Sequence, residues 1–490
     1  MCRVYGLRWL WGVVLMVSLS LYPRLLVAQE LDVSALVGED WYGLYLNGQK
    51  AGWSRNAVSI EDDKTVVVVE DAHFRVNMAG LNQDMEILSK RCYAPDGSLL
   101  QIDYALSDPA GEKDFHAVVT GDELTLTSTI AGETSTKRFP RPAESLKDVL
   151  KQAQLVSRGA QVGDSVSFSL FDPMYQKEIT GVSRIVETEK RMLDGAETKV
   201  FRVHTTMDLM GIESDSFVTE DGTVLEDIVA GIITMRIEPE AMAKDVNYNN
   251  DVIVSNAAMI EEPIPEARTR EMLRLRLEGP LSGDHLFNDE RQTIRAVDGT
   301  FDFVGKRVSL EGFKAMRLPL GDTCPDAVAQ WLEPTPFVQS DDPKIVAKAR
   351  EIVGDETDAV AVSKTLCEWV HDNVRTTFSA QLSNAREVLD RLEGDCTEYS
   401  ILFIGLARAA GLPAREVAGL IYMESGGQPG FYFHQWAKVW VGKWIDVDPT
   451  FDQPLADATH IKLAQGDLFE QAKLIPIIGR LRIEVVEPQP

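Results

Sequence analysis

The apolar residues of this chain change their spacing along its length, and this change limits the folds open to it. Between about residues 35 and 250 they mostly alternate with polar residues, as at Phe74, Val76 and Met78. A period of two is typical of strands with one buried face, and Asp-Gly pairs between the runs favour hairpin turns. We therefore predict an antiparallel β-rich region, either a β-sandwich or an open, curved sheet.

Two polar, proline-rich stretches, 261–266 and 334–344, interrupt the second half of the chain. Alternation returns between them, at Leu273, Leu275 and Leu277, which predicts a second and smaller β-rich region. The expected segments are, in order, a signal peptide, an N-terminal β-rich domain, the smaller β-rich region and a C-terminal domain: 1–28, 29–255, 268–322 and 330–490.

From about residue 360 the apolar positions follow a helical period. Leu366, Trp369 and Val370 recur at i, i+3 and i+4, as on the buried face of an amphipathic helix. A further short helix is expected over 385–392. The mixture of strands and helices predicts an α+β protein.

A third helix is expected to begin after Asp395. Asp395 with Glu398 three residues later is a capping-box pattern, and Gly411 is a helix stop. This pattern places Cys396 in the first turn of a largely buried helix. Free N–H groups and the helix dipole there stabilise a thiolate, so we predict a thiol pKa below its usual value of about 8.5, although Asp395 opposes this.

A histidine and an aspartate follow Cys396 in the order that thiol catalysis needs. His434 lies in the alternating stretch 431–441, and Asp448 ends a second expected strand, 444–447. A cysteine nucleophile needs a base, and the base needs a carboxylate that fixes its tautomer. We therefore predict Cys396, His434 and Asp448 as catalytic residues.

The turn between these two strands decides whether the side chains can meet. A two-residue loop at 442–443 would put His434 and Asp448 on opposite faces of the hairpin. A three-residue loop pairs Trp440 with Trp444 and brings Asp448 to the face of His434. We predict an odd-length turn or a bulge, an Asp448 oxygen within hydrogen-bonding distance of His434, and the other imidazole nitrogen facing the cysteine.

These residues also carry a family resemblance. Over roughly residues 330–475, the segments GDCTEYSILFIGLARAAGLPAR, FHQWAKVWVGKWIDVDPTF and ADATHIKL resemble the transglutaminase-like domains of exported bacterial proteins. In that family the helix-borne Cys, the His of H-x-W and the Asp of D-P-T form the triad, which implies the same roles for Cys396, His434 and Asp448. The resemblance implies a papain-like fold, with the helix-borne Cys packed on an antiparallel sheet. Gln435 stands where Ala is usual.

The expected function is acyl transfer by an exported thiol enzyme. Hydrolysis of a peptide or amide bond is favoured, because water is abundant outside the cell and no lysine pocket is specified. The alternatives are a transamidase that cross-links proteins and a non-catalytic envelope scaffold. In the favoured case the N-terminal β-rich domain positions or binds the substrate.

Other polar and aromatic residues of this region have simpler explanations. His371 lies four residues after Cys367 on the expected helix, but no further ligands accompany them, so packing is favoured over a metal site. His460, in the A-D-A-T-H segment, is expected to be structural. The tryptophans are expected to pack on the sheet, although one indole N–H near the thiol could bind an oxyanion: Trp436, Trp440 and Trp444.

The remaining cysteines suggest neither a zinc site nor a disulfide framework. Of the 5 cysteines, Cys2 lies in the signal segment, and the others contain no C-x-x-C pair. At most one bridge is expected among Cys92, Cys324 and Cys367. No metal and no cofactor is expected.

Acidic residues outnumber basic ones. Lys plus Arg is 49 and Asp plus Glu is 76, which gives a net charge of -27 at pH 7. Such a surface repels phosphate backbones and anionic headgroups. We therefore expect no nucleic-acid partner and no strong membrane association after removal of the signal segment.

The first 28 residues have the pattern of a secretory signal peptide. Arg3 and Arg8 precede an apolar run from Trp9 to Tyr22, and three small or apolar residues, 26–28, follow. We expect a periplasmic protein, the alternatives being an extracellular one or one held by an uncleaved N-terminal anchor. The expected partner is a peptide or protein substrate in the cell envelope, and the sequence does not specify the oligomeric state.

Overall fold

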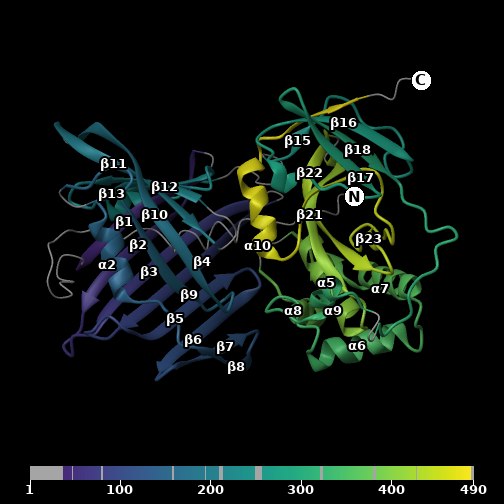
Figure 1. The fold of residues 1–490 in the computed structure, drawn as a ribbon, viewed down its shortest axis with the longest axis horizontal. Helices are drawn as coiled ribbons and strands as arrows, with labels where there is room; N and C mark the ends of the chain where they lie inside the picture. The colour runs from purple at the N-terminus through teal and green to yellow at the C-terminus, as the bar shows by residue number, and fades with distance from the viewer. Residues whose placement is uncertain are drawn as a thin grey trace. The chain divides into compact units, whose positions relative to one another are not determined.

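The computed structural model describes residues 37–486, except 47, 79–80, 157–158, 194, 209–212, 249–255, 321–323, 379–381 and 426–427. The chain forms two compact units and passes from one to the other near residue 250 (Figure 1). The predicted signal segment, 1–28, lies outside the described residues. None of the helices described is both long and apolar enough to span a membrane.

The first unit is built on one antiparallel sheet. Its strands are β1 (Gly38–Leu46), β2 (Gln49–Ile60), β3 (Val66–Met78), β4 (Leu81–Tyr93), β5 (Leu99–Asp108), β6 (Gly111–Thr120), β7 (Glu123–Ile130), β8 (Glu133–Pro140), β9 (Ser165–Asp172), β10 (Lys177–Leu193), β11 (Ala196–Met207), β12 (Glu213–Thr219), β13 (Val224–Val229) and β14 (Ile233–Ile237). The 14 strands follow one path, β8-β7-β6-β5-β4-β3-β2-β1-β14-β13-β12-β11-β10-β9. This is one continuous sheet, the second of the two predicted arrangements.

The alternating sequence explains these strands. Along β5, Ile102, Tyr104 and Leu106 are buried, whereas the residues between them are partly exposed. The Asp-Gly turns at 96–97 and 221–222 join β4 to β5 and β12 to β13, as predicted. The helices described in this unit are α2 (Leu146–Gln154) and α3 (Glu240–Ala243).

The described residues of the second unit form three sheets. Their strands are β15 (Ala258–Met259), β16 (Met272–Glu278), β17 (Gln292–Val297), β18 (Thr300–Lys306), β19 (Arg375–Thr376), β20 (Glu393–Gly394), β21 (Ala414–Ser425), β22 (Gln428–Trp440), β23 (Trp444–Val447), β24 (His460–Gln465) and β25 (Arg482–Val485). One sheet has the order β15-β22-β21-β24 with β23 paired to β22, and another has the order β17-β18-β16-β25. Strands β19 and β20 form a short parallel pair.

The helices that the structure describes in this unit are α5 (Asp326–Ala329), α6 (Pro343–Val353), α7 (Ala359–Asn373), α8 (Ala385–Arg391), α9 (Cys396–Ala409) and α10 (Leu468–Gln471), with 3-10 turns η2 (Gly283–His285), η4 (Gln330–Leu332) and η5 (Ala472–Ile477). Helices α7, α8 and α9 confirm the three predicted helices. Helix α6 was not predicted: it begins inside the proline-rich stretch, where Asp342 caps the amides of Lys344 and Ile345.

Helix α9 is the centre of a hydrophobic core. All its residues from Cys396 to Arg408 are buried, and helices α6, α7 and α8 pack around it. Apolar residues of β22 and β23, including Val439 and Val447, belong to the same core. A helix buried on every side is fixed firmly, which matters for the cysteine at its first position.

A second core joins the small β region to the end of the chain. Leu275 of β16 and Ile461 of β24 are buried in it, and so is Ile483 of β25. Strand β25 pairs with β16 through Leu277 and Ile483. The predicted regions 268–322 and 330–490 therefore share a sheet and a core within the second unit.

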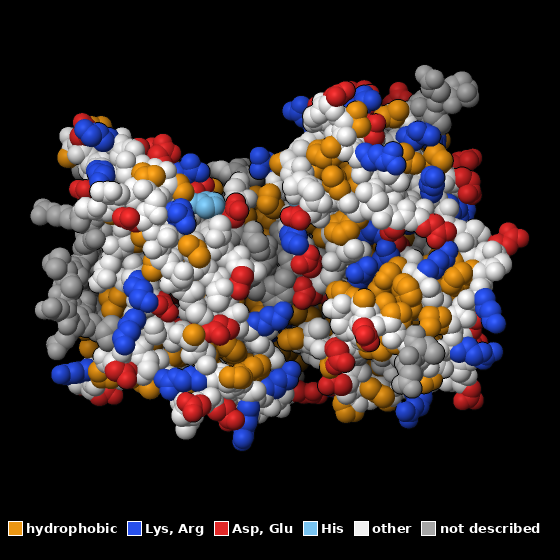
Figure 2. All heavy atoms as spheres, in the orientation of Figure 1, with side chains coloured by type: hydrophobic (Ala, Val, Ile, Leu, Met, Phe, Trp, Pro, Cys, Tyr) orange, Lys and Arg blue, Asp and Glu red, His pale blue; other side chains and the backbone are white. Residues whose placement is uncertain are grey.

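Figure 2 shows acidic and basic side chains interspersed over both units on the face drawn. The net negative charge is therefore not gathered into one patch on this face. Cys92, Cys324, Cys367 and Cys396 are all free thiols.

Candidate active site

Cys396 is the first residue of α9, as predicted from the capping box. The Asp395 side chain accepts a hydrogen bond from the Thr397 amide at 2.9 Å, and the Asp395 amide donates to Glu398 at 2.9 Å. Glycine is required before this cap, because a Cβ on Gly394 would lie 2.2 Å from the Cβ of Glu398. The cap fixes where the helix starts and so fixes the position of the Cys396 thiol.

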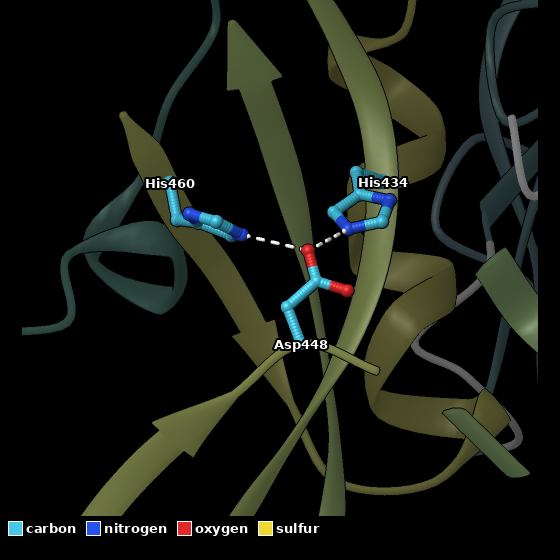
Figure 3. Close-up of side chains that lie close together, drawn as sticks. All are labelled: His434, Asp448 and His460. Carbon is cyan, nitrogen blue, oxygen red and sulfur yellow. Dashed lines mark hydrogen bonds and ion pairs between the residues drawn. The ribbon is translucent and has the colours of Figure 1, made fainter. Parts of the chain in front are cut away.

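The hairpin of β22 and β23 brings His434 and Asp448 together. Trp440 pairs with Trp444, which confirms the predicted three-residue loop. His434 Nε2 lies 2.8 Å from Asp448 Oδ2 (Figure 3). Since a carboxylate only accepts, Nε2 carries the hydrogen of the neutral imidazole. The predicted hydrogen bond is thereby confirmed.

The other imidazole nitrogen is free to act as a base. His434 Nδ1 is buried and has no hydrogen-bond partner among the described residues. The next residue along β22, Gln435, donates its amide to the Cys396 sulfur at 3.4 Å. Ser400 links α9 to β22 at this point, bonding the carbonyls of Cys396 and Gln435 at 2.7 and 3.1 Å. That Nδ1 of His434 faces the thiol stays a prediction.

The predicted lowering of the Cys396 pKa is wrong. Burial raises the pKa of this thiol well above its usual value, and the negative charge of Asp395 raises it further. The sulfur has no exposed surface, so the loss of hydration outweighs the helix dipole. Burial also lowers the pKa of His434, against the opposing effect of Asp448. The resting pair is therefore a neutral thiol and a neutral imidazole.

The Asp448 carboxylate is held ionised by its partners. Burial alone would raise its pKa, but the adjacent His434 and the hydrogen bond from His460 bring the pKa well below its usual range. The Thr450 amide donates to Oδ1 at 2.9 Å. Each carboxylate oxygen thus has at least one donor, which fixes the group in one orientation.

His460 is the residue whose place in the site the sequence interpretation missed. Its Nε2 lies 3.0 Å from the same Asp448 oxygen, and its Nδ1 lies 3.1 Å from Asp457 Oδ1. Figure 3 shows the carboxylate between the two imidazoles, one from β22 and the other from β24. The aspartate three residues before His460 in A-D-A-T-H was the available signal.

The side chains of His434, Asp448 and His460 lie close enough together to hold a metal ion. One ligand atom from each of His434, Asp448 and His460 lies within 4.8 Å of the others. However, one carboxylate oxygen already lies at hydrogen-bonding distance from both Nε2 atoms. The donor set therefore fits a hydrogen-bonded chain of side chains.

Trp436 packs on the sheet, as predicted, and does not supply an oxyanion donor. Its ring stacks on His434 with centroids 5.8 Å apart, and its Nε1 donates to Asp446 at 3.0 Å. Trp440 and Trp444 pack edge to face with each other. The indole N–H of Trp436 is therefore already used.

A buried group of charges fixes the small β region against the sheet that carries both histidines. Asp289 accepts from Lys438 at 2.8 Å and also from Lys462. Burial opposes the charge of Asp289, but these lysines lower its pKa to about 2. Arg291 donates to the carbonyl of His460 at 2.5 Å. The segment between β16 and β18 thus helps to position β24.

A groove of about 820 Å³ opens beside Asp457, the partner of His460. Its lining includes Arg307, Lys364, Arg268, Gln453 and Asp457. The Asp457 carboxylate accepts from Gln453 at 2.8 Å and from Arg268 at 3.2 Å. Asp457 therefore connects the groove to the buried imidazoles.

Comparison with known proteins places part of this chain in a family. Residues 346–449 match the model of the transglutaminase-like superfamily. An uncharacterized protein of Haemophilus influenzae is 30% identical over 99 residues, which are 19% of this chain and 26% of that protein. The match thus spans about a quarter of that relative.

Two solved structures also align with the chain. A candidate cysteine protease from Cytophaga hutchinsonii is 18% identical, covering 44% of this chain and 82% of its own, with a TM-score of 0.30. A candidate protease from Parabacteroides distasonis is 10% identical, covering 80% and 65%, with a TM-score of 0.19. Because both TM-scores are low, the family assignment rests on the sequence match of residues 346–449. Residues 346–449 of this chain therefore form a transglutaminase-like domain.

Proposed function

We propose that the second unit is a thiol enzyme that transfers acyl groups through Cys396, His434 and Asp448. The observation that carries the proposal is the state of His434. One of its nitrogens is bonded to Asp448, while the other is buried and has no hydrogen-bond partner within the described part of the chain. The residue beside it on β22 contacts the Cys396 sulfur. This is the order of groups that a nucleophile, a base and an orienting carboxylate require.

In the proposed reaction, His434 Nδ1 takes the thiol proton as the sulfur attacks the carbonyl carbon of an amide. The resulting oxyanion lies at the start of α9. Asp395 accepts hydrogen bonds from the amides of Thr397 and Glu398, which leaves the Cys396 amide as the first-turn donor for the oxyanion. His434 then returns its proton to the leaving amine, and a thioester remains on Cys396.

Water completes the proposed cycle. It attacks the thioester, His434 accepts its proton, and the acid leaves as the thiol is restored. An amine in place of water would give transamidation, which is the second candidate. The proposal places the enzyme outside the cytoplasm, with a peptide or protein of the cell envelope as substrate and the N-terminal sheet as the module that binds or positions it.

A peptide and amide library incubated with the full chain in ¹⁸O-labelled water tests this proposal. Hydrolysis puts one labelled oxygen into the new carboxylate, whereas transamidation joins the acyl group to an added amine. Cys396→Ala should abolish both products and leave the melting temperature within a few degrees, since one small buried residue replaces another. Cys324→Ala, at a partly exposed free thiol, is the control that should retain activity.

A non-catalytic scaffold would give a different result. The wild type and Cys396→Ala would then show the same product profile. Such an outcome would overturn the proposed function.

A further inference from the structure

His460 lies between two buried carboxylates. Its side chain and that of Asp448 have no exposed surface, and the side chain of Asp457 is 4% exposed. Nε2 faces Asp448 at 3.0 Å, and Nδ1 faces Asp457 at 3.1 Å. A carboxylate offers only lone pairs, so each ring nitrogen needs a hydrogen to bond its partner. The geometry therefore requires the imidazolium form of His460.

Both carboxylates are anchored by other donors. Asp457 accepts from the Thr459 amide at 2.8 Å and from Arg268 at 3.2 Å. Asp448 accepts from the Thr450 amide at 2.9 Å. Although burial alone would raise the pKa of each carboxyl, the neighbouring cations and donors hold it below its usual range. Each aspartate is thus a fixed anion on one side of the ring.

The charges around His460 balance. Asp448 and Asp457 supply two negative charges, and the imidazolium and Arg268 supply two positive ones. Among the residues that the structure describes, His434 is the other titratable group facing the ring, with ring centroids 5.8 Å apart. Trp436 meets the ring edge-on at 5.1 Å, and Arg291 bonds the backbone carbonyl of His460. A second positive charge on His434 would therefore face an existing one.

We propose that His460 is a positioning residue of the site. As an imidazolium it holds the Asp448 carboxylate against His434 and keeps resting His434 neutral, ready to take the thiol proton. The inference rests on the proposed function for its catalytic meaning, because a neutral base matters only if Cys396 is the nucleophile. The paired charges themselves do not depend on catalysis.

Histidine NMR on the full chain tests the pairing directly. With ¹³C at Cε1 of all histidines, His434→Gln and His460→Gln assign the two signals. His460 should titrate above the usual value of about 6.5, and His434 below it. Burial alone lowers the pKa of His460, but Asp457 and Asp448 raise it. Asp457→Asn, which keeps the shape of the side chain, should shift the His460 titration to lower pH.

The decisive comparison is the titration of His434 in the His460→Gln variant against its titration in the wild type. Removing the positive charge should raise the pKa of His434. The rate of acyl transfer should fall at least about tenfold because the carboxylate loses its support, and the acidic limb of the pH–rate profile should move to higher pH. His285→Gln is the matched control, since His285 is also buried but bonds neutral groups, Ser282 and the Lys473 carbonyl. It should change neither the His434 titration nor the rate.

Three results would overturn the inference. The first is a His460 that stays neutral throughout the titration. The second is a His434 titration that is the same in folded His460→Gln and in the wild type. The third is one equivalent of zinc that copurifies with the wild type and is lost in His460→Gln, which would make the cluster a metal site. If His460→Gln does not fold, the His460 titration in Asp457→Asn is the test, and a titration that is the same as in the wild type would overturn the inference. The expected shifts without any acyl transfer by the wild type would count against the proposed function alone.

Discussion

At the scale of single residues, the Cys396 thiol is controlled by burial more than by its place on a helix. A helix start favours a thiolate, yet the sulfur is fully buried and Asp395 adds a negative charge beside it. Desolvation raises the free energy of the thiolate by more than the helix dipole lowers it. The proton must therefore move during the reaction itself.

Alkylation of Cys396 tests this account of the thiol. Its rate as a function of pH should have a midpoint above the usual value of about 8.5. Asp395→Asn should shift the midpoint to lower pH, because asparagine still caps a helix but carries no charge. Asp390→Asn, at an exposed residue paired with Lys344, should leave the midpoint unchanged. A wild-type midpoint at or below the usual value would contradict the neutral resting pair.

The sequence predicts those features of the site that depend on residues close together in the chain, and not those that depend on contacts between distant segments. The cap at Asp395 and the hairpin that aligns His434 with Asp448 are local, and both predictions are confirmed. The pKa of Cys396 and the partners of His460 depend on how α9, β22 and β24 pack together. Their registers are set by contacts between distant parts of the chain, so local spacing could not predict them.

At the scale of elements, β21 controls how closely the two histidine-bearing strands approach. Gly419 of β21 pairs with His434 on one side and with Lys462, two residues beyond His460, on the other. A Cβ on Gly419 would lie 1.9 Å from the Ile461 carbonyl oxygen. The missing side chain thus permits the irregular pairing of β21 with β24.

Gly419→Ala should therefore destabilise the second unit. Backbone atoms must move to admit the methyl group, and we expect a loss of at least about 2 kcal/mol in the free energy of unfolding. Urea unfolding measures it. Gly283→Ala adds the same atom where nothing lies within 4 Å and should cost far less. Equal losses in the two variants would contradict the importance of close approach at Gly419.

A buried acid in the sheet of the first unit gives a prediction about pH. Burial raises the pKa of Asp227, on β13, to about 7, although Ser216 donates a hydrogen bond to it. The folded chain therefore keeps a proton that the unfolded chain loses near pH 4, so this group lowers stability as the pH rises from about 4 to 7.

Asp227→Asn should remove this pH dependence. We expect the substitution to stabilise the protein by about 1–3 kcal/mol more at pH 8 than at pH 4.5, because asparagine accepts the same hydrogen bond without a charge. Calorimetric unfolding at the two pH values measures the difference. A substitution effect that is the same at both values would contradict the raised pKa.

At the scale of the whole molecule, the spacing of apolar residues predicts the strands of the small β region but not the strands with which they pair. Strand β16 pairs with β25, about 200 residues later in the chain, and no local pattern links the two. The first proline-rich stretch is also packed, since Ile264 is buried and its amide donates to Tyr422 at 2.9 Å. Proline content alone therefore does not show where a chain divides.

Limited proteolysis should consequently separate the chain near residue 250 and leave 268–322 attached to the C-terminal domain. The buried backbone at Ile264, and at Val338 in the second proline-rich stretch, should resist cleavage. Mass spectrometry of the first stable fragments identifies the cut. A stable fragment that begins near residue 330 would instead support a separate catalytic domain.

The central claim is that Cys396 becomes acylated with the help of His434. Rapid-quench mass spectrometry with a p-nitrophenyl ester of a short peptide measures the rate at which the acyl group appears on each cysteine. We predict an acyl adduct on Cys396, which water then hydrolyses. In His434→Gln the adduct should form at least about 100-fold more slowly, because that variant lacks the base. An adduct that forms on Cys396 equally fast without His434, or that forms only on other cysteines, would contradict the account.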